Sequence, residues 1–198
     1  QTQPKTQAVT MDQLSQAQIK DLQYLCEEEK LARDVYAVLF DKWQIQAFSN
    51  IGSTENRHII SVQDLAKKYG VPLNDALAAG KFNNAELQQA YNDLTAKGLQ
   101  SPEAALKVGA YIEELDINDI NKMTNEALPT DIRQTFDWLN MGSRNHLRGF
   151  VRSMQNQSMT YQPQLLTQAE YEAIINSPQE RGGQGQGGGH GQGQRHAY

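Results

Sequence analysis

The chain contains, at residues 22–39, the stretch LQYLCEEEKLARDVYAVL. Its core positions recur at steps of three and four residues, which is the spacing of a helix that packs along one face in a bundle. The members of this seam are Leu22, Leu25, Glu29, Ala32, Tyr36 and Leu39. We therefore predict a long helix from about Ser15 to Trp43, with the carboxylate of Glu29 placed among core residues.

The same period continues along the rest of the chain. The predicted elements are long helices from residue 49 or 53 to 69, from 101 through 120 and from 130 through 153, and short helices over 84–97 and 167–176. Gly70 and Gly98 follow helices, whereas Ser101 and Pro102 are typical of a helix start. These elements predict an all-α four-helix bundle, with a short helix in the long crossover between the second and third long helices and a short C-terminal helix.

The two ends of the chain differ from its middle. Residues 1–12 lack apolar periodicity, and residues 179–198 are dominated by Gly and Gln. Such segments bury too little apolar surface to offset the entropy of folding. We predict a flexible segment over 1–12, a helical domain over 13–178 and a disordered tail over 179–198. The polar start without an initiator Met is typical of an exported protein, periplasmic or extracellular.

Composition narrows the class of function. Lys and Arg number 18 against 23 Asp and Glu, for a net charge of -5. This balance disfavours binding to nucleic acid. No apolar run reaches the roughly 20 residues that a membrane-spanning helix needs. The single cysteine, Cys26, excludes an internal disulfide or a cluster held by cysteines alone, so any metal must be bound by oxygen and nitrogen.

Ionisable residues occupy core positions on all four predicted long helices. They are Glu29 on the first, Glu55 and His58 on the second, Glu113 on the third and His146 on the fourth. An unpartnered buried carboxylate costs several kcal/mol, so this pattern requires a positive charge among these residues. Glu and His three residues apart share a helix face, and carboxylates with Glu-x-x-His form the donor set of di-iron and di-manganese bundle sites.

The pattern therefore predicts a metal centre inside the bundle, with two iron ions as the first expectation and manganese, zinc or copper as alternatives. The other interpretation needs no metal. In that interpretation Arg33 or Arg144 neutralises Glu29 and Glu113 in a buried salt-bridge network.

Several motifs also resemble known families. EEEKLARDVY at 27–36 is similar to the first-helix ligand motif of rubrerythrin-type ferritin-like proteins, and Glu55-Asn-Arg-His58 resembles their second-helix Glu-x-x-His. Together with STENRH, LKVGAYIEELDI and GSRNHLRGFVR, these motifs resemble the prokaryotic ferritin-like family DUF2202 over about residues 14–155. The resemblance implies a ferritin-like fold and a carboxylate/histidine metal site.

One position departs from the ferritin-like pattern. Ser143 stands three residues before His146, where the family pattern has Glu. We expect Glu114, Asp116 or Glu28 to replace this carboxylate, with the acidic cluster on the third long helix favoured. Otherwise Glu114 points away from the seam into solvent, or the site holds one metal.

Two functions follow from these observations. In the first, the metal centre handles dioxygen, peroxide or metal ions as a small oxidase or peroxidase, with electrons from an external donor because the chain has no Cys-x-x-Cys motif. In the second, a metal-free exported bundle serves as a scaffold for interactions. A homodimer is compatible with both.

Overall fold

The computed structural model describes residues 13–74 and 77–181, and this part of the chain contains six helices and no strand. The helices are α1 (Gln16–Trp43), α2 (Gln46–Tyr69), α3 (Ala85–Gly98), α4 (Pro102–Met123), α5 (Thr130–Gln155) and α6 (Gln168–Ile175). The prediction of an all-helical protein is confirmed. The predicted flexible segment over 1–12, and the tail beyond residue 181, lie outside the described residues.

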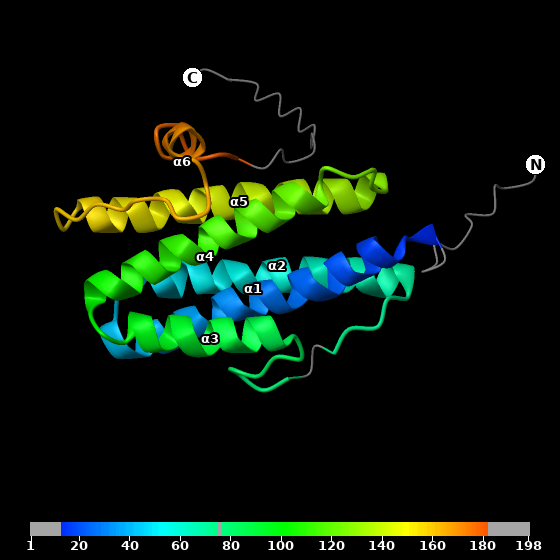
Figure 1. The fold of residues 1–198 in the computed structure, drawn as a ribbon, viewed down its shortest axis with the longest axis horizontal. Helices are drawn as coiled ribbons and strands as arrows, with labels where there is room; N and C mark the ends of the chain where they lie inside the picture. The colour runs from blue at the N-terminus through cyan, green and yellow to red at the C-terminus, as the bar shows by residue number, and fades with distance from the viewer. Residues whose placement is uncertain (1–12, 75–76, 182–198) are drawn as a thin grey trace, which may run out of the picture.

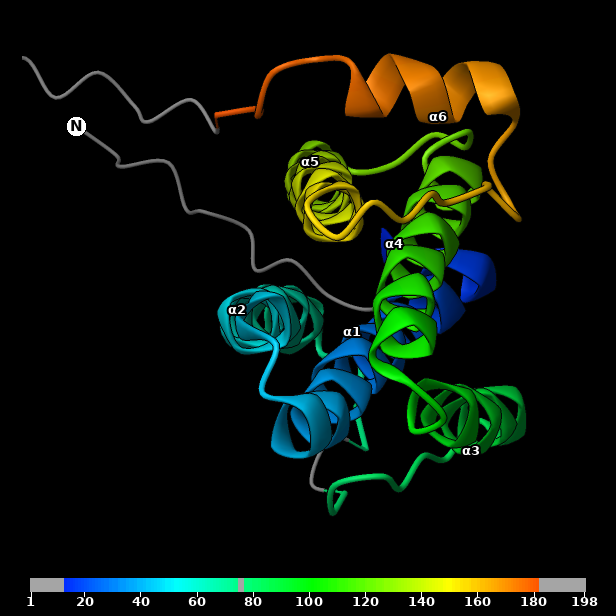
Figure 2. The ribbon, with the colours of Figure 1, turned by 90° about the vertical axis from the view of Figure 1, so that its left-hand side faces the viewer.

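The four long helices, α1, α2, α4 and α5, extend along the molecule (Figure 1). α1 packs most extensively against α2, and α4 against α5. The view along the helices shows α3 beside α1 and α4, and α6 over α5 (Figure 2). The connection from α2 to α4 contains α3, as the sequence predicts. No helix among the described residues is long and apolar enough to cross a membrane.

Side-chain caps define most helix starts at the predicted positions. Ser15 accepts a hydrogen bond from the Gln18 backbone N–H, in a capping box completed by the Gln18 side chain. Thr167 forms the equivalent box at the start of α6. At the starts of α3 and α4, the Asn84 side chain accepts from the N–H groups of residues 86 and 87, and the Ser101 side chain accepts from the Ala104 N–H. These local signals are readable in sequence because a cap needs only residues within one helical turn.

The start of α2 differs from the prediction. The helix begins at Gln46, three residues before the earlier of the two predicted starts. Its N-cap, Ile45, makes no side-chain capping hydrogen bond. α1 ends instead through Gln44, whose left-handed backbone (φ 54°) lets its N–H donate to the Phe40 carbonyl. A start without a capping side chain leaves no signal in the sequence.

The apolar core is divided into two clusters. One includes Leu31, Tyr36, Phe48 and Phe150, and the other includes Leu22, Val62 and Phe136. The boundary falls between Cys26 and Leu31 on α1, Ile51 and Ile59 on α2, and Leu139 and Leu147 on α5. Ionisable side chains lie at this boundary on each of these helices, so a polar layer interrupts the core at mid-height.

Gly109 on α4 allows the aromatic part of this core to close. A Cβ atom at this position would lie 2.5 Å from Phe150 Cε1, and the Phe150 ring packs against Tyr36 and Phe48. We expect Gly109→Ala to lower the free energy of unfolding by about 1–3 kcal/mol, because the buried ring cannot move without displacing its neighbours. Urea denaturation measures this change.

Gly52→Ala is the matched control for this substitution. A Cβ atom at position 52 would lie 3.6 Å from Tyr36 Cβ, which is an ordinary contact. Alanine there should stabilise α2 slightly through its higher helix propensity. Equal effects of the two substitutions would contradict the packing assigned to Gly109.

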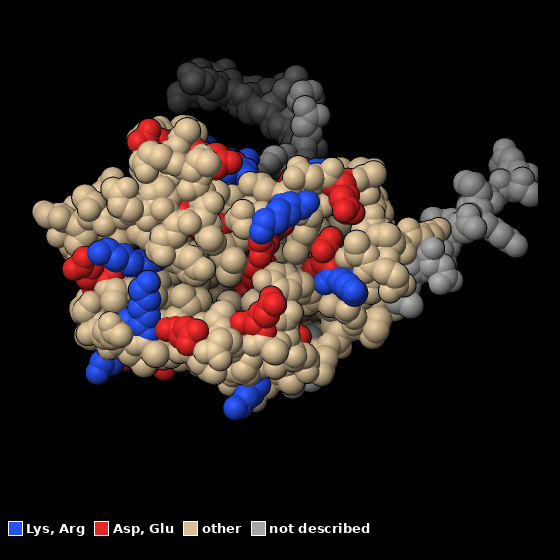
Figure 3. All heavy atoms as spheres, in the orientation of Figure 1, with Lys and Arg blue, Asp and Glu red and all other residues tan. Residues whose placement is uncertain are grey.

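The outer surface shows no comparable segregation of charge on the face seen in Figure 3. Acidic and basic side chains are interspersed over this face, and neither sign forms an extended patch. This face therefore offers no concentrated charge of either sign.

Candidate metal centre

Four helices bring the five predicted ligands together. Glu29 comes from α1, Glu55 and His58 from α2, Glu113 from α4 and His146 from α5, and all five are buried. They form two groups, one of Glu29, Glu55 and His58 and one of Glu55, Glu113 and His146. In each group one donor atom per residue lies within 4.8 Å of the others, so both groups have dimensions that could hold a metal ion.

The first group surrounds the His58 ring. Its Nδ1 lies 3.0 Å from Glu29 Oε2 and 2.8 Å from Glu55 Oε2. The i, i+3 spacing on α2 directs Glu55 and His58 to the same face, as the sequence predicts. Glu29 reaches this face from α1.

The second group repeats this arrangement around His146. The Nδ1 atom of His146 lies 2.8 Å from Glu55 Oε1 and 3.4 Å from Glu113 Oε2. The His58 and His146 rings are stacked, with centroids 5.5 Å apart. Glu55 therefore lies between the histidines and offers one oxygen to each group, which is the position of a bridging carboxylate.

Several donor atoms of the two groups have no hydrogen-bond partner among the described residues. They are Glu29 Oε1, both Glu55 oxygens, Glu113 Oε2 and His146 Nδ1. The 2.8 Å distance from His146 Nδ1 to Glu55 Oε1 is short enough for a hydrogen bond, but the angles between the two groups do not meet the requirement for one. Buried polar atoms are rarely left unpaired, and atoms that converge without bonding one another suit a shared cation. These residues therefore fit a metal pair.

Burial shifts the protonation of these side chains. It raises the pKa of Glu29 to about 7 despite the neighbouring His58, and it also raises the pKa of Glu113. Burial by itself would lower the pKa of His58, but Glu29 and Glu55 raise it to about 10. His146 and His58 outweigh burial at Glu55 and hold its pKa well below the usual range. The carboxylates therefore require nearby positive charge to remain ionised in the core.

A glycine on α5 accommodates the His58 ring. A Cβ atom at Gly142 would lie 2.6 Å from His58 Nε2. Trp138, one turn earlier on α5, contacts the same ring edge-on, with centroids 5.0 Å apart. α5 thus contacts the back of the imidazole while its Nδ1 faces the carboxylates.

Tyr36 orients the Glu113 carboxylate. Its hydroxyl donates a hydrogen bond of 2.6 Å to Glu113 Oε1, and the whole side chain is buried. Burial and the nearby Glu113 carboxylate raise the pKa of Tyr36 well above its ordinary value, so the phenol keeps its proton. Glu113 Oε2 remains directed toward His146.

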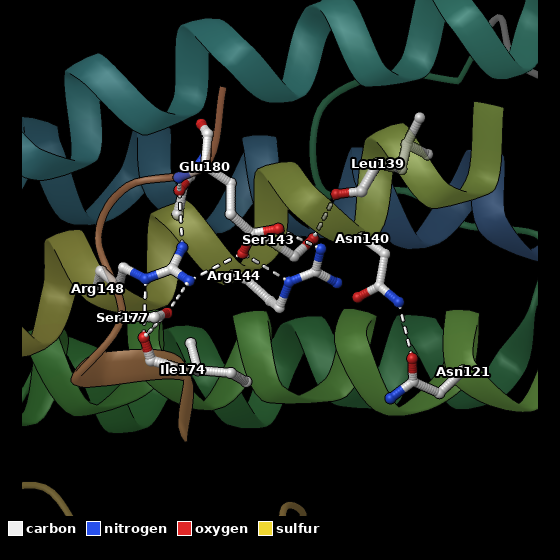
Figure 4. A network of polar contacts seen from close by, with 10 residues as sticks. Asn121, Leu139, Asn140, Ser143, Arg144, Arg148, Ile174, Ser177 and Glu180 are labelled. Atoms are coloured by element: carbon white, nitrogen blue, oxygen red, sulfur yellow. Dashed lines mark hydrogen bonds and ion pairs between the residues drawn. The ribbon is translucent and has the colours of Figure 1, made fainter. Parts of the chain in front are cut away.

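The arginines of the alternative interpretation are used elsewhere. Arg33 donates to the adjacent Asp34. Arg144 forms a two-pronged ion pair with Glu180, and Arg148 donates to Glu180, Ser177 and the Ile174 carbonyl (Figure 4). Neither Arg33 nor Arg144 forms an ion pair with Glu29 or Glu113 among the described contacts. The two arginines of that interpretation are therefore engaged elsewhere, and the positive charges that lie beside these carboxylates are the imidazoles of His58 and His146.

The Glu180 contacts also extend the ordered domain. Beyond the predicted boundary at residue 178, Glu180 also bonds to Asn145 through both its backbone N–H and its carbonyl. The sequence after α6 carries no periodic pattern, so only these long-range contacts reveal its place against α5.

This ion pair predicts a pH-dependent stability. Arg144 and Arg148 hold the pKa of Glu180 down to about 2, against about 4.3 for an ordinary Glu. A carboxyl whose pKa is lower in the folded state stabilises the fold above its unfolded pKa and loses that effect as pH falls toward its folded pKa. Glu180→Gln should therefore lower stability at pH 7, and its difference from the parent should shrink between about pH 4.3 and 2.

Urea denaturation across this pH range measures the effect. Glu172→Gln, an exposed substitution on α6, serves as the control and should change stability little at any pH. A constant difference between Glu180→Gln and the parent down to pH 2 would contradict the assigned ion pair.

None of the three residues expected to replace the carboxylate missing at Ser143 belongs to the two ligand groups of the described residues. Glu114 lies outside both ligand groups and accepts hydrogen bonds from the Tyr161 hydroxyl and from backbone N–H groups of residues 164–166. It is buried rather than solvated. Asp116 and Glu28 belong to neither ligand group, although both are fully buried with unpaired oxygens. Ser143 donates to the Leu139 carbonyl within its own helix.

Two features of the structure could not be predicted from the sequence. Gly142 reads as an ordinary helical glycine until its distance to His58 is known, and Glu180 lies in a segment of low complexity. Both depend on contacts between residues distant along the chain, which local patterns do not encode.

Comparison with known proteins identifies the family of this chain. The family model for an uncharacterized protein domain, DUF2202, matches residues 18–178. The chain belongs to the DUF2202 family. The uncharacterized protein MJ0754 of Methanocaldococcus jannaschii is 44% identical over 172 residues, which cover 85% of this chain and 92% of that protein.

A solved structure also resembles this DUF2202 chain. The crystal structure of the hypothetical protein MJ0754 from Methanococcus jannaschii matches with a TM-score of 0.83 at 40% identity. The match covers 91% of this chain and 100% of that chain. The family predicted from the four motifs is therefore confirmed, and the helical arrangement is shared with a relative.

Proposed function

We propose that this DUF2202 protein is a ferritin-like metalloprotein that binds about two metal ions, iron in the first instance, and reacts with dioxygen, peroxide or oxidisable metal ions. The observation that carries this proposal is the set of unpaired donor atoms in two groups that share Glu55. The four long helices with α3 in the crossover fit a ferritin-like bundle.

The donor set favours iron or manganese. Each group offers two carboxylates and one imidazole. Hard oxygen donors with a single imidazole suit iron and manganese, whereas copper(I) prefers sulfur donors. Bound iron would supply redox chemistry and open coordination positions for a small oxidant. Glu55 would be shared by both ions, Glu29 and His58 would bind one, and Glu113 and His146 would bind the other.

The surrounding residues have separate roles. Tyr36 fixes Glu113 by its hydrogen bond, and Gly142 and Trp138 fix the His58 ring. Glu28 and Asp116 are buried neighbours of the centre on α1 and α4, and burial raises the pKa of both well above ordinary values. Electrons would come from an external donor or from a reduced metal ion that is oxidised as the substrate.

Elemental analysis tests this function. Protein purified from its native compartment without added metal should contain about two iron or manganese ions per chain, and should consume peroxide or dioxygen on addition of Fe²⁺. His58→Ala should lose the ion of the first group and His146→Ala that of the second, and both should lose the consumption of peroxide or dioxygen. Absence of metal from the parent, with both variants as stable as the parent, would contradict the proposal and favour a metal-free scaffold.

A further inference from the structure

A groove opens between α2 and α5 directly over the two histidines. It has a volume of about 660 Å³, and both His58 and His146 line it. Gly142 of α5 faces His58, whereas Gly149 faces Ile51, so the two helices are antiparallel along the groove. Gly142 and Gly149 of α5 line the groove and add no side chain to it. The groove is therefore an opening from the surface to the ligand set.

The lining of this groove differs in charge from the rest of the protein. Its lining includes Arg57, Arg148 and Arg152 but no Asp or Glu, in a chain whose net charge is -5. Arg148 is neutralised by Glu180. Arg57 and Arg152 are exposed and form no ion pair within the described part of the chain; Arg57 donates only to Thr54 Oγ1. Two positive charges therefore face the groove without an acidic partner.

The two arginines lie at different levels of the groove. The antiparallel pairing places Arg57 beside the histidines and Arg152 toward the start of α2. Between them the lining contains apolar and amide side chains, among them Ile51 and Asn145, and Trp138 closes the end near His58. This combination of charged rim, amides and an aromatic wall is typical of a site for a small molecule.

The groove is larger than an oxidant such as dioxygen or peroxide requires. Dioxygen and hydrogen peroxide each have only two non-hydrogen atoms, so they need only a narrow path to a metal. A volume of about 660 Å³ lies within the range of roughly 300–1,000 Å³ found for small-molecule sites. The groove thus has room for an organic molecule beside the centre.

We propose that the groove binds a small organic anion, held by Arg57 at its charged group and by Trp138 and Ile51 at its apolar part, while Arg152 offers a second positively charged contact toward the start of α2. The position of this ligand next to the metal centre rests on the proposed function, whereas its recognition by the arginines does not. The guanidinium groups bind carboxylate or phosphate through paired hydrogen bonds, and the absence of acidic side chains from the lining keeps their charge available.

Benzoate serves as the test ligand, with neutral benzamide as its isostere. The chain has two tryptophans, and only Trp138 lines the groove. Trp43 lies on α1, where it donates to the Gly98 carbonyl, so Trp43→Phe leaves Trp138 as the single reporter. Its fluorescence is titrated with each compound, in metal-depleted protein and again after loading with Fe²⁺ under argon. Inorganic phosphate is added as a competitor.

We expect saturable binding of benzoate in both forms, little binding of benzamide, and displacement by phosphate. Arg57→Gln/Arg152→Gln should weaken benzoate binding by about tenfold or more, since each arginine contributes a charge-assisted hydrogen bond. Lys20→Gln/Lys67→Gln removes the same charge from exposed positions of α1 and α2 outside the groove, and should leave binding unchanged.

Three results would overturn the proposal. Equal binding of benzoate and benzamide would show that charge is not recognised. Equal weakening by the arginine and lysine variants would show only a general field effect. Binding solely in the iron-loaded form, unaffected by the arginines, would make benzoate a metal ligand. By contrast, arginine-dependent binding in a protein that takes up no metal would support the groove and contradict the proposed metal centre.

Discussion

Glu55→Gln should remove both metal ions from the protein. The substitution keeps the size of the side chain but replaces one oxygen by an NH₂ group, which cannot bind a cation, and removes the negative charge. Because Glu55 approaches His58 with one oxygen and His146 with the other, both groups lose a ligand at once. We expect the metal content, measured by elemental analysis, to fall from about two ions per chain to nearly none.

Two further variants make this result specific. Glu29→Gln alters only the first group, so it should release one ion before the other. Glu114→Gln removes a buried carboxylate next to Glu113 on α4 that binds Tyr161 and backbone N–H groups instead. It should retain the metal but lower the free energy of unfolding by about 1–3 kcal/mol. Full metal retention in Glu55→Gln would contradict a shared carboxylate.

The convergence of the five candidate ligands in the core could be predicted from sequence because helical periodicity is a local property. Once Glu29, Glu55, Glu113 and His146 share the spacing of apolar neighbours, each must face the core, and four core-facing helices bring them together. The i, i+3 relation of Glu55 and His58 then follows from the helix itself. Helix caps such as Ser15 and Thr167 were predictable for the same reason, because they act within one turn.

Other features depend on distances across the fold. Both Glu113 and Glu114 are buried, yet one points toward the histidines and the other toward residues 161–166, because α4 is covered on two sides. The helical period separates them by about 100° but does not say that a loop covers the second face. The pairing of Glu180 with Arg144 likewise joins residues 36 positions apart, and the sequence offers no pattern for it.

Gly142→Ala should disturb the metal centre without touching a ligand. The new Cβ would lie 2.6 Å from His58 Nε2, well inside contact distance. The ring cannot swing away freely, because Nδ1 is held beside Glu29 and Glu55 and Trp138 packs against it. We expect the ring to shift and the affinity of the first group for metal to fall by about 10–100-fold, as for loss of a residue that orients a ligand. Titration with Co²⁺, followed by its visible absorption, measures this affinity.

Gly149→Ala is the control on the same helix. A Cβ atom there would lie 3.5 Å from Ile51 Cδ1, which is an ordinary contact. Both substitutions gain up to about 1 kcal/mol of helix propensity over glycine, so this common term cancels in the comparison. Gly149→Ala should therefore be at least as stable as the parent and bind Co²⁺ equally well. If Gly142→Ala also bound Co²⁺ with the parental affinity, His58 would not be held in place by α5, and its orientation would have to come from Glu29 and Glu55 alone.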